Sequence, residues 1–248
     1  SCKGITDACK FLNTPVTGGN VSLYNDTKLP DNNVIPIHPT PVIGMVGLIE
    51  DINKICKKSW LNAGDQIWMI GLPLETNINQ DKRISLAASS FLEYIHGLKT
   101  GRPPEIDLNL EKQVHSFLRT IINKGIINSA HDLGDGGLAV AISECCISSG
   151  YGANIMLPIS QSRLDRLLFA EGGARVIVSC SSDQSVELKK YYKNIFSKET
   201  NTFSISNLGN VNNQKKLLVY QSDNLIIDIN IQDLKDTYID TIYKKITK

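Results

Sequence analysis

The stretch His131-Asp132-Leu133-Gly134-Asp135-Gly136-Gly137-Leu138 decides how the middle of the chain folds. It is polar and rich in glycine, and it runs directly into the apolar residues 138–147, which predicts a turn at the start of a buried helix. Glycines at 150 and 152 then indicate a turn, and the apolar run 153–157 predicts a strand. This alternation of strands and helices continues on both sides, and it predicts a mixed α/β (α+β) fold in which helices flank a mixed sheet.

Apolar patterns in the rest of the chain predict the other elements. Residues 41–49 are apolar on both faces, as in a buried strand, and residues 66–71 repeat that pattern. A stripe of apolar residues on one helix face predicts a helix that Asp107 caps and Gly125 ends. Further helices are predicted at 3–13, 82–96, 163–169, 183–196 and 232–248, and further strands at 126–127, 176–180, 203–205, 216–220 and 225–231.

A second informative stretch is Thr17-Gly18-Gly19-Asn20-Val21-Ser22-Leu23-Tyr24-Asn25. Its adjacent glycines can take a positive φ and let a ligand approach the backbone, whose N–H groups suit phosphate oxygens. The amide oxygen of Asn20 suits a hard cation such as Mg²⁺, and the Ser22 hydroxyl can donate to a phosphate. The same residues also fit a polar turn between two elements, so the residue types leave an anion-binding loop and a plain turn open.

Three carboxylates are further candidates for a ligand site. Asp132 and Asp135 stand three residues apart at a predicted helix N-terminus, where they would hold a cation that neutralises a bound phosphate. In the alternative interpretation, Asp135 caps the helix and Asp132 braces the turn. Glu171 precedes the apolar strand 176–180; it contacts a ligand or forms an ion pair with Arg175, and the ion pair is the default interpretation.

Composition excludes several classes of function. The formal net charge is +1, which does not favour a nucleic-acid partner, and no apolar run reaches the roughly 20 residues of a membrane span. The six cysteines form no Cys-x-x-Cys pair and the four histidines have no zinc-site spacing, so we expect a cytoplasmic protein with reduced thiols. The chain begins with Ser1 inside a helical pattern, which predicts a piece of a longer protein with an exposed apolar face.

Five stretches of the sequence, given at the end of this paragraph, stand in the order found in phosphoribosylformylglycinamidine synthase. They resemble the C-terminal half of its long synthetase subunit. The resemblance implies an ATP-dependent ligase of purine biosynthesis that forms a C–N bond. Its reaction converts formylglycinamide ribonucleotide, ATP and ammonia to formylglycinamidine ribonucleotide, with Mg²⁺ bound. A glutaminase subunit supplies the ammonia, and a small third subunit assists. The stretches are 17–25, 39–44, 97–108, 131–138 and 169–171.

The resemblance also implies a division of the chain and roles for single residues. Residues 1–61 resemble the end of the second N-lobe, residues 62–230 the second C-lobe, and residues 231–248 form a helical tail. Gly19 would contact ATP, Asn20 would bind Mg²⁺ and Ser22 would contact the substrate. Further ligand-site candidates are Gly18, Asp132, Asp135 and Glu171.

The family's catalytic histidines lie in its first half, so we expect no catalytic residue in this chain and no activity from the chain alone. One departure is Gly134, where the family usually has serine, and this loses a hydroxyl from the turn. Two alternatives stay open. One is a related synthetase of the same superfamily, such as aminoimidazole ribonucleotide or selenophosphate synthetase; the other is a non-catalytic scaffold half.

Overall fold

The chain forms two compact units, Ser1–Glu50 and Asp51–Lys248. The structure is a computed structural model, which describes residues 1–21, 25–37, 40–74, 81–160, 162–196 and 203–246.

The unit Ser1–Glu50 contains one helix and one hairpin. Helix α1 (Cys2–Leu12) is followed by its C-cap Asn13, whose backbone takes the left-handed conformation and donates to carbonyl groups of the last turn. Strands β1 (Asp26–Lys28) and β2 (Val34–Pro36) pair antiparallel as a two-stranded sheet, and every residue of both strands is exposed. The predicted helix at 3–13 is therefore confirmed.

The prediction of a buried strand at 41–49 is wrong for this structure. These residues form no strand, and their apolar side chains are exposed; Val46 is fully so. A strand needs neighbours for its backbone N–H and C=O groups, and a single hairpin is too small to bury another apolar strand. The expected exposed apolar face is therefore present in this unit.

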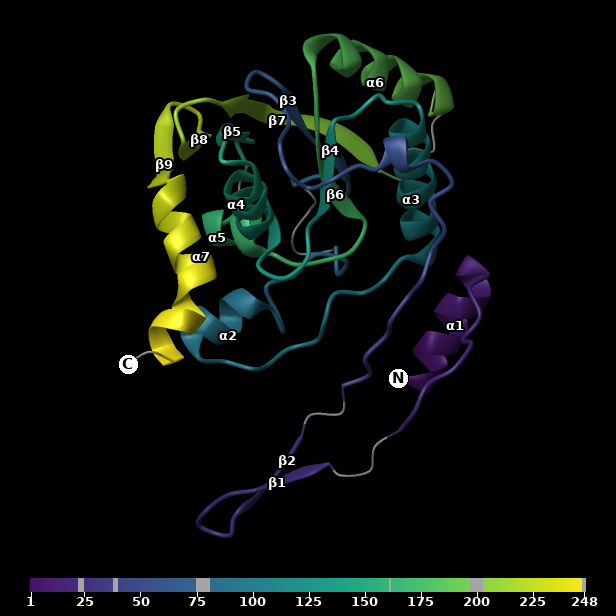
Figure 1. The fold of residues 1–248 in the computed structure, drawn as a ribbon, viewed down its shortest axis with the longest axis vertical. Coiled ribbons are helices and arrows are strands. Elements are labelled where there is room, and N and C mark those ends of the chain that lie inside the picture. The colour runs from purple at the N-terminus through teal and green to yellow at the C-terminus, as the bar shows by residue number, and fades with distance from the viewer. Residues whose placement is uncertain (22–24, 38–39, 75–80, 161, 197–202, 247–248) are drawn as a thin grey trace. The chain divides into compact units, whose positions relative to one another are not determined.

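The unit Asp51–Lys248 is built on one mixed sheet of seven strands (Figure 1). The order is β4-β6-β3-β7-β5-β8-β9, and every neighbouring pair is antiparallel except β5 with β8. This confirms the predicted mixed α/β class. The strands are β3 (Gln66–Gly71), β4 (Ser129–Asp132), β5 (Gly152–Leu157), β6 (Arg175–Cys180), β7 (Ser204–Asn212), β8 (Lys216–Gln221) and β9 (Asn224–Asn230).

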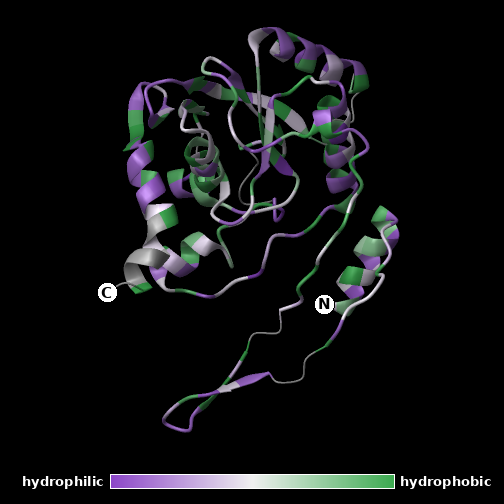
Figure 2. Ribbon diagram, in the orientation of Figure 1, coloured by the Kyte–Doolittle hydropathy of each residue, from purple (hydrophilic) through white to green (hydrophobic). Residues whose placement is uncertain are grey.

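Helices cover both faces of this sheet (Figure 1). Successive side chains of a strand point to opposite faces, so β3 sends Ile67 and Met69 into one core and Trp68 and Ile70 into the other. Figure 2 shows α4 as largely hydrophobic, in agreement with its burial, whereas α6 mixes both kinds of residue. The first core takes α4 (Gly137–Ser149), α5 (Leu164–Phe169) and α7 (Ile231–Ile246); the second takes α3 (Leu108–Asn123) and α6 (Ser182–Ile195).

Helix α3 begins where the sequence predicts it. The Asp107 carboxylate accepts hydrogen bonds from the backbone N–H groups of Asn109 and Leu110, which supplies partners for two donors of the first turn. The helix ends at Asn123, and its apolar stripe is buried. Among the described residues, no helix combines the length and apolarity needed to span a membrane.

The predicted helix at 82–96 is only half correct, because α2 covers Ser90–His96 alone. The preceding residues are held in an extended loop. The backbone of Ser85 exchanges two hydrogen bonds of 2.9 Å with the backbone of Glu171, which removes both its groups from a helical ladder. Ala88 then takes a φ of 55°, a left-handed conformation that interrupts a helix. Tertiary pairing therefore overrides the local helical pattern.

Candidate functional site

The predicted phosphate and metal loop lies in the unit Ser1–Glu50. Gly18, Gly19 and Asn20 are exposed and belong to no helix or strand, and Ser22 lies outside the described residues. Neither glycine has a positive φ, and a Cβ atom built on either would meet no heavy atom within 4 Å. Within this unit, neither turn geometry nor packing requires glycine at these two positions.

The turn between β4 and α4 is built differently, because packing does require its glycines. Gly136 has a φ of 77° and Gly137 a φ of 64°. A Cβ on Gly137 would lie 2.6 Å from the carbonyl oxygen of Ala170, and one on Gly136 would lie 2.4 Å from a methyl group of Val140. This turn is therefore held tightly against the segment that contains Glu171.

Both aspartates of this turn face solvent. The Asp132 side chain is 80% exposed and its carboxylate lies 3.3 Å from His131 Nδ1, and Asp135 is also exposed. Gly136 is the N-cap of α4 and has no side chain of its own to make a capping hydrogen bond. The alternative in which Asp135 caps the helix is therefore wrong, because that cap position falls one residue later.

Glu171 makes a contact that the sequence does not predict. Its Oε1 atom accepts hydrogen bonds of 2.8 Å from the backbone N–H groups of Ser90 and Gly136. These residues start α2 and α4, where backbone N–H groups have no partner within the helix and carry partial positive charge. The carboxylate therefore satisfies donors at two helix starts that are far apart in the sequence.

The default ion pair between Glu171 and Arg175 is not formed. The Arg175 guanidinium instead donates from Nη2 to the carbonyl oxygen of Ala170 at 2.7 Å. The side chain is only 3% exposed, and its Nε atom has no hydrogen-bond partner among the described residues. Burial lowers the pKa of Arg175 to about 10, and the nearby charge of Glu171 opposes that shift, so the group stays protonated near neutral pH.

A cluster around Glu144 is the arrangement that sequence reasoning missed. Glu144 Oε2 lies 2.7 Å from His131 Nε2 and accepts a hydrogen bond of 3.2 Å from Lys58, and Oε1 accepts one of 2.9 Å from the Tyr238 hydroxyl. Burial would raise the pKa of Glu144, but these three hydrogen bonds and the charge of Lys58 lower it overall. The four side chains come from separate segments, so no local pattern could reveal the cluster.

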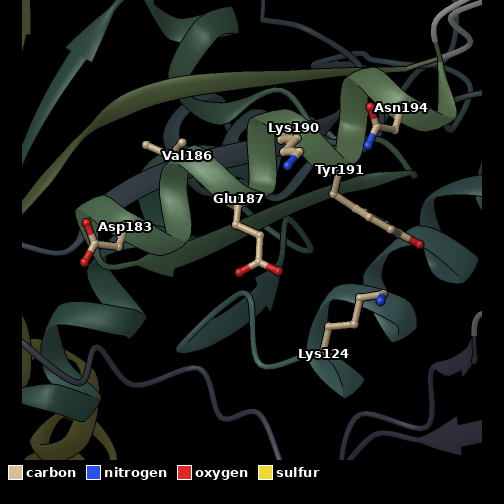
Figure 3. Close-up of a pocket in the computed structure, with 7 residues that line it drawn as sticks. All are labelled: Lys124, Asp183, Val186, Glu187, Lys190, Tyr191 and Asn194. Atoms are coloured by element: carbon tan, nitrogen blue, oxygen red, sulfur yellow. The ribbon is translucent and has the colours of Figure 1, made fainter.

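A surface groove of about 410 Å³ lies between the end of α3 and α6 (Figure 3). It contains none of the predicted site residues. Positive and negative side chains alternate around it and most are exposed, so it gathers no net charge for an ionic ligand. Its lining residues are Lys124, Asp183, Val186, Glu187, Lys190, Tyr191 and Asn194.

Comparison with known proteins identifies the family. Residues 62–215 match the family model described as AIR synthase related protein, C-terminal domain. The relative named phosphoribosylformylglycinamidine synthase subunit PurL from Prochlorococcus marinus (strain NATL2A) is 84% identical over the whole chain, which covers 31% of that relative. The relative of the same name from strain MIT 9303 is 50% identical over 99% of the chain, again covering 31% of its length.

Solved structures agree on the fold. Thermotoga maritima PurL complexed with FGAR matches 74% of this chain and 30% of its own, with a TM-score of 0.60 and 19% sequence identity. The phosphoribosylformylglycinamidine synthase II of the same organism matches 74% and 28%, with a TM-score of 0.56 and 17% identity. The chain spans about a third of the length of the curated relatives that it matches. The resemblance predicted from the motifs is thus confirmed, and the chain belongs to the AIR synthase related protein family, whose C-terminal domain it contains.

Proposed function

We propose that this chain is the C-terminal portion of a phosphoribosylformylglycinamidine synthase. The whole enzyme would be an ATP-dependent C–N ligase that converts formylglycinamide ribonucleotide and ammonia to formylglycinamidine ribonucleotide. One observation carries the proposal: a relative with that name is 84% identical to this chain in an alignment that covers all 248 residues of it. The related Thermotoga maritima protein has been solved in complexes with ATP and with FGAR.

The loop that begins at Gly18 would be one edge of the active site. Backbone N–H groups at Gly18 and Gly19 would donate to ATP phosphates, and the Ser22 hydroxyl would contact the ribonucleotide substrate. Support comes from the two glycines, which neither a positive φ nor close packing requires in this unit. A close approach of a ligand to the backbone is a reason for glycine at both positions.

Asn20 would hold Mg²⁺ through its side-chain oxygen. Among the described residues, no three carboxylate, histidine or cysteine side chains group as a metal site. A single neutral amide suits a metal that binds mainly to phosphate oxygens and water, which is the usual behaviour of Mg²⁺. Bound there, Mg²⁺ would neutralise negative charge on the transferring phosphoryl group.

The chemistry follows from these contacts. ATP transfers its γ-phosphoryl group to the amide oxygen of the substrate, and ammonia then attacks the activated carbon and displaces phosphate. The residues of this chain would hold the phosphates and the ribonucleotide in position, and the N–H donors would stabilise charge as it develops. No group in the chain is proposed to transfer a proton. Asp132 and Asp135, which are both exposed, would serve this site or an auxiliary nucleotide site.

The partners follow from the part of the longer protein that this chain represents. We propose lobes at 1–61 and 62–230 and a tail at 231–248, in a cytoplasmic assembly with a glutaminase subunit and a small third subunit. The exposed apolar residues 41–49 would pair with a segment of the same protein outside these 248 residues. Their exposure, and the lack of a described sheet in their unit beyond one hairpin, support this.

Reconstitution tests the function. The chain is mixed with the separately produced remainder of the enzyme, and phosphate release is measured with ATP, ammonia and formylglycinamide ribonucleotide. We expect turnover that needs all three substrates and both pieces. Phosphate release that does not depend on formylglycinamide ribonucleotide, or no phosphate release from the reconstituted pair, would contradict the proposal.

Asn20→Ala separates a site role from a scaffold role. In the reconstituted enzyme we expect a rate loss of at least about tenfold, since a metal ligand is removed, with no change in thermal stability because the residue is exposed. Asn109→Ala, at an exposed position of α3, is the matched control and should leave the rate unchanged. An unchanged rate in Asn20→Ala would favour the scaffold alternative.

A further inference from the structure

The Glu171 carboxylate lies where two loops distant in sequence meet. Its Oε1 atom accepts from the N–H of Ser90, 81 residues away, and from that of Gly136, 35 residues away, both at 2.8 Å. These are the described hydrogen bonds of this side chain, and both partners are backbone groups.

The backbone around Glu171 is held in place by close contacts on both sides. Glu171 and Ser85 exchange two backbone hydrogen bonds of 2.9 Å. At the next residue, Gly172, a Cβ would lie 2.2 Å from the carbonyl oxygen of Arg83, and at Gly173 it would lie 2.0 Å from Glu111 Oε1. The backbone of residues 171–173 is thus closely packed on both sides, and the Glu171 side chain extends from this packed segment.

The turn that follows β4 is tied to this segment at two points. The backbone N–H of Leu133 donates to the carbonyl oxygen of Arg175 at 3.0 Å, and that of Gly136 donates to Glu171. Asp135 lies between these two points and Asp132 directly before them. Glu171 therefore holds the end of this turn, next to Asp135, whereas the pairing of β4 with β6 holds Asp132.

We propose that Glu171 is a positioning residue: it clasps the start of α2 to the turn 132–137 through two backbone N–H groups. The clasp stands on geometry alone. Its consequence, that Asp135 is held ready for a nucleotide ligand, rests on the proposed function. The clasp needs an oxygen acceptor at Oε1, so glutamine, whose amide oxygen can take the same place, preserves it.

Residue-resolved amide hydrogen exchange tests the clasp in the 248-residue chain. In Glu171→Ala, we expect the amides of Ser90 and Gly136 to exchange at least about tenfold faster, because each loses its acceptor. The amide of Leu133 reports whether the turn itself loosens. Glu171→Gln should restore protection to within about threefold of the unmodified chain at both amides, since the acceptor oxygen is kept. Glu105→Ala, which removes an exposed carboxylate 3.7 Å from Lys82, is the control and should change none of the three.

Unchanged exchange at Ser90 and Gly136 in Glu171→Ala would overturn the proposal, as would an equal acceleration in Glu105→Ala. If Glu171→Ala fails to fold, Glu171→Asp provides the same test. Its side chain is one methylene shorter and cannot reach both donors, so at least one of the two amides should lose protection. These readouts need no turnover. A failed reconstitution would contradict the proposed enzyme but would not affect the proposed role of Glu171. Unchanged amide exchange would contradict the role of Glu171 but would not affect the proposed enzyme.

Discussion

Two apolar segments of similar pattern have opposite fates in this protein. Residues 41–49 are exposed and form no strand, whereas β3, which begins 17 residues further along the chain, lies in the middle of a seven-stranded sheet with Ile67 and Ile70 completely buried. The amino-acid types do not separate the two. The difference is that β3 has β6 and β7 as neighbours, and helices cover both of its faces. An apolar run predicts burial only where partner strands exist to bury it.

The largest expected difference between the two segments is in the free energy of unfolding when one apolar side chain of each is truncated to alanine. Ile67→Ala should lower the free energy of unfolding by about 3–4 kcal/mol, because it leaves a cavity beside β3. Val46→Ala should change it by less than about 0.5 kcal/mol, because no packing is lost. Urea titration of both variants measures the difference. A similar cost for both would mean that residues 41–49 pack in solution.

The glycines of the two regions give the next contrast. Gly71 has a φ of 121°, and a Cβ there would lie 1.7 Å from the carbonyl oxygen of Ala174, whereas a Cβ on Gly44 meets no atom within 4 Å. We expect Gly71→Ala to destabilise the protein by about 2–3 kcal/mol through backbone strain and displacement of β6. Gly44→Ala should be neutral to within about 0.5 kcal/mol. Thermal unfolding of the two variants tests this, and a stable Gly71→Ala variant would show that the β3–β6 register adjusts easily.

The smallest expected effect is a pH dependence in the larger unit. The pKa of Glu144 is lowered in the folded protein, so its ionised form contributes stability above its ordinary pKa near 4.5. That contribution is lost as the pH falls through the lowered folded value. Glu144→Gln should therefore be less stable than the unmodified chain at pH 7, by about 1 kcal/mol, and the gap should shrink below about pH 4.5. The free energies of unfolding of Glu144→Gln and of the unmodified chain, measured from pH 7 to pH 3, test this prediction. A difference between them that grows as the pH falls would contradict it.

Local patterns predicted most elements of the larger unit. Asp107 and Gly125 frame α3 because capping and left-handed glycine are local effects, and β3, β5 and β6 follow from short apolar runs between turns. The strand predicted at 126–127 lies instead at Ser129–Asp132. The departure at 82–96 has a non-local cause, the backbone pairing of Ser85 with Glu171. Sequence patterns cannot anticipate a hydrogen bond between residues 86 positions apart.

The candidate site divides in the same way. The sequence by itself determined the glycine-rich loops, the mixed α/β class and the family, because motif order and apolar periodicity are properties of the chain. Only the tertiary structure decided what the individual side chains do. It placed Asp132 and Asp135 in solvent, separated Glu171 from an ion pair with Arg175, and gave its carboxylate to two backbone N–H groups. A half-buried acceptor takes the nearest unsatisfied donors in space, and distance along the chain does not determine which donors those are.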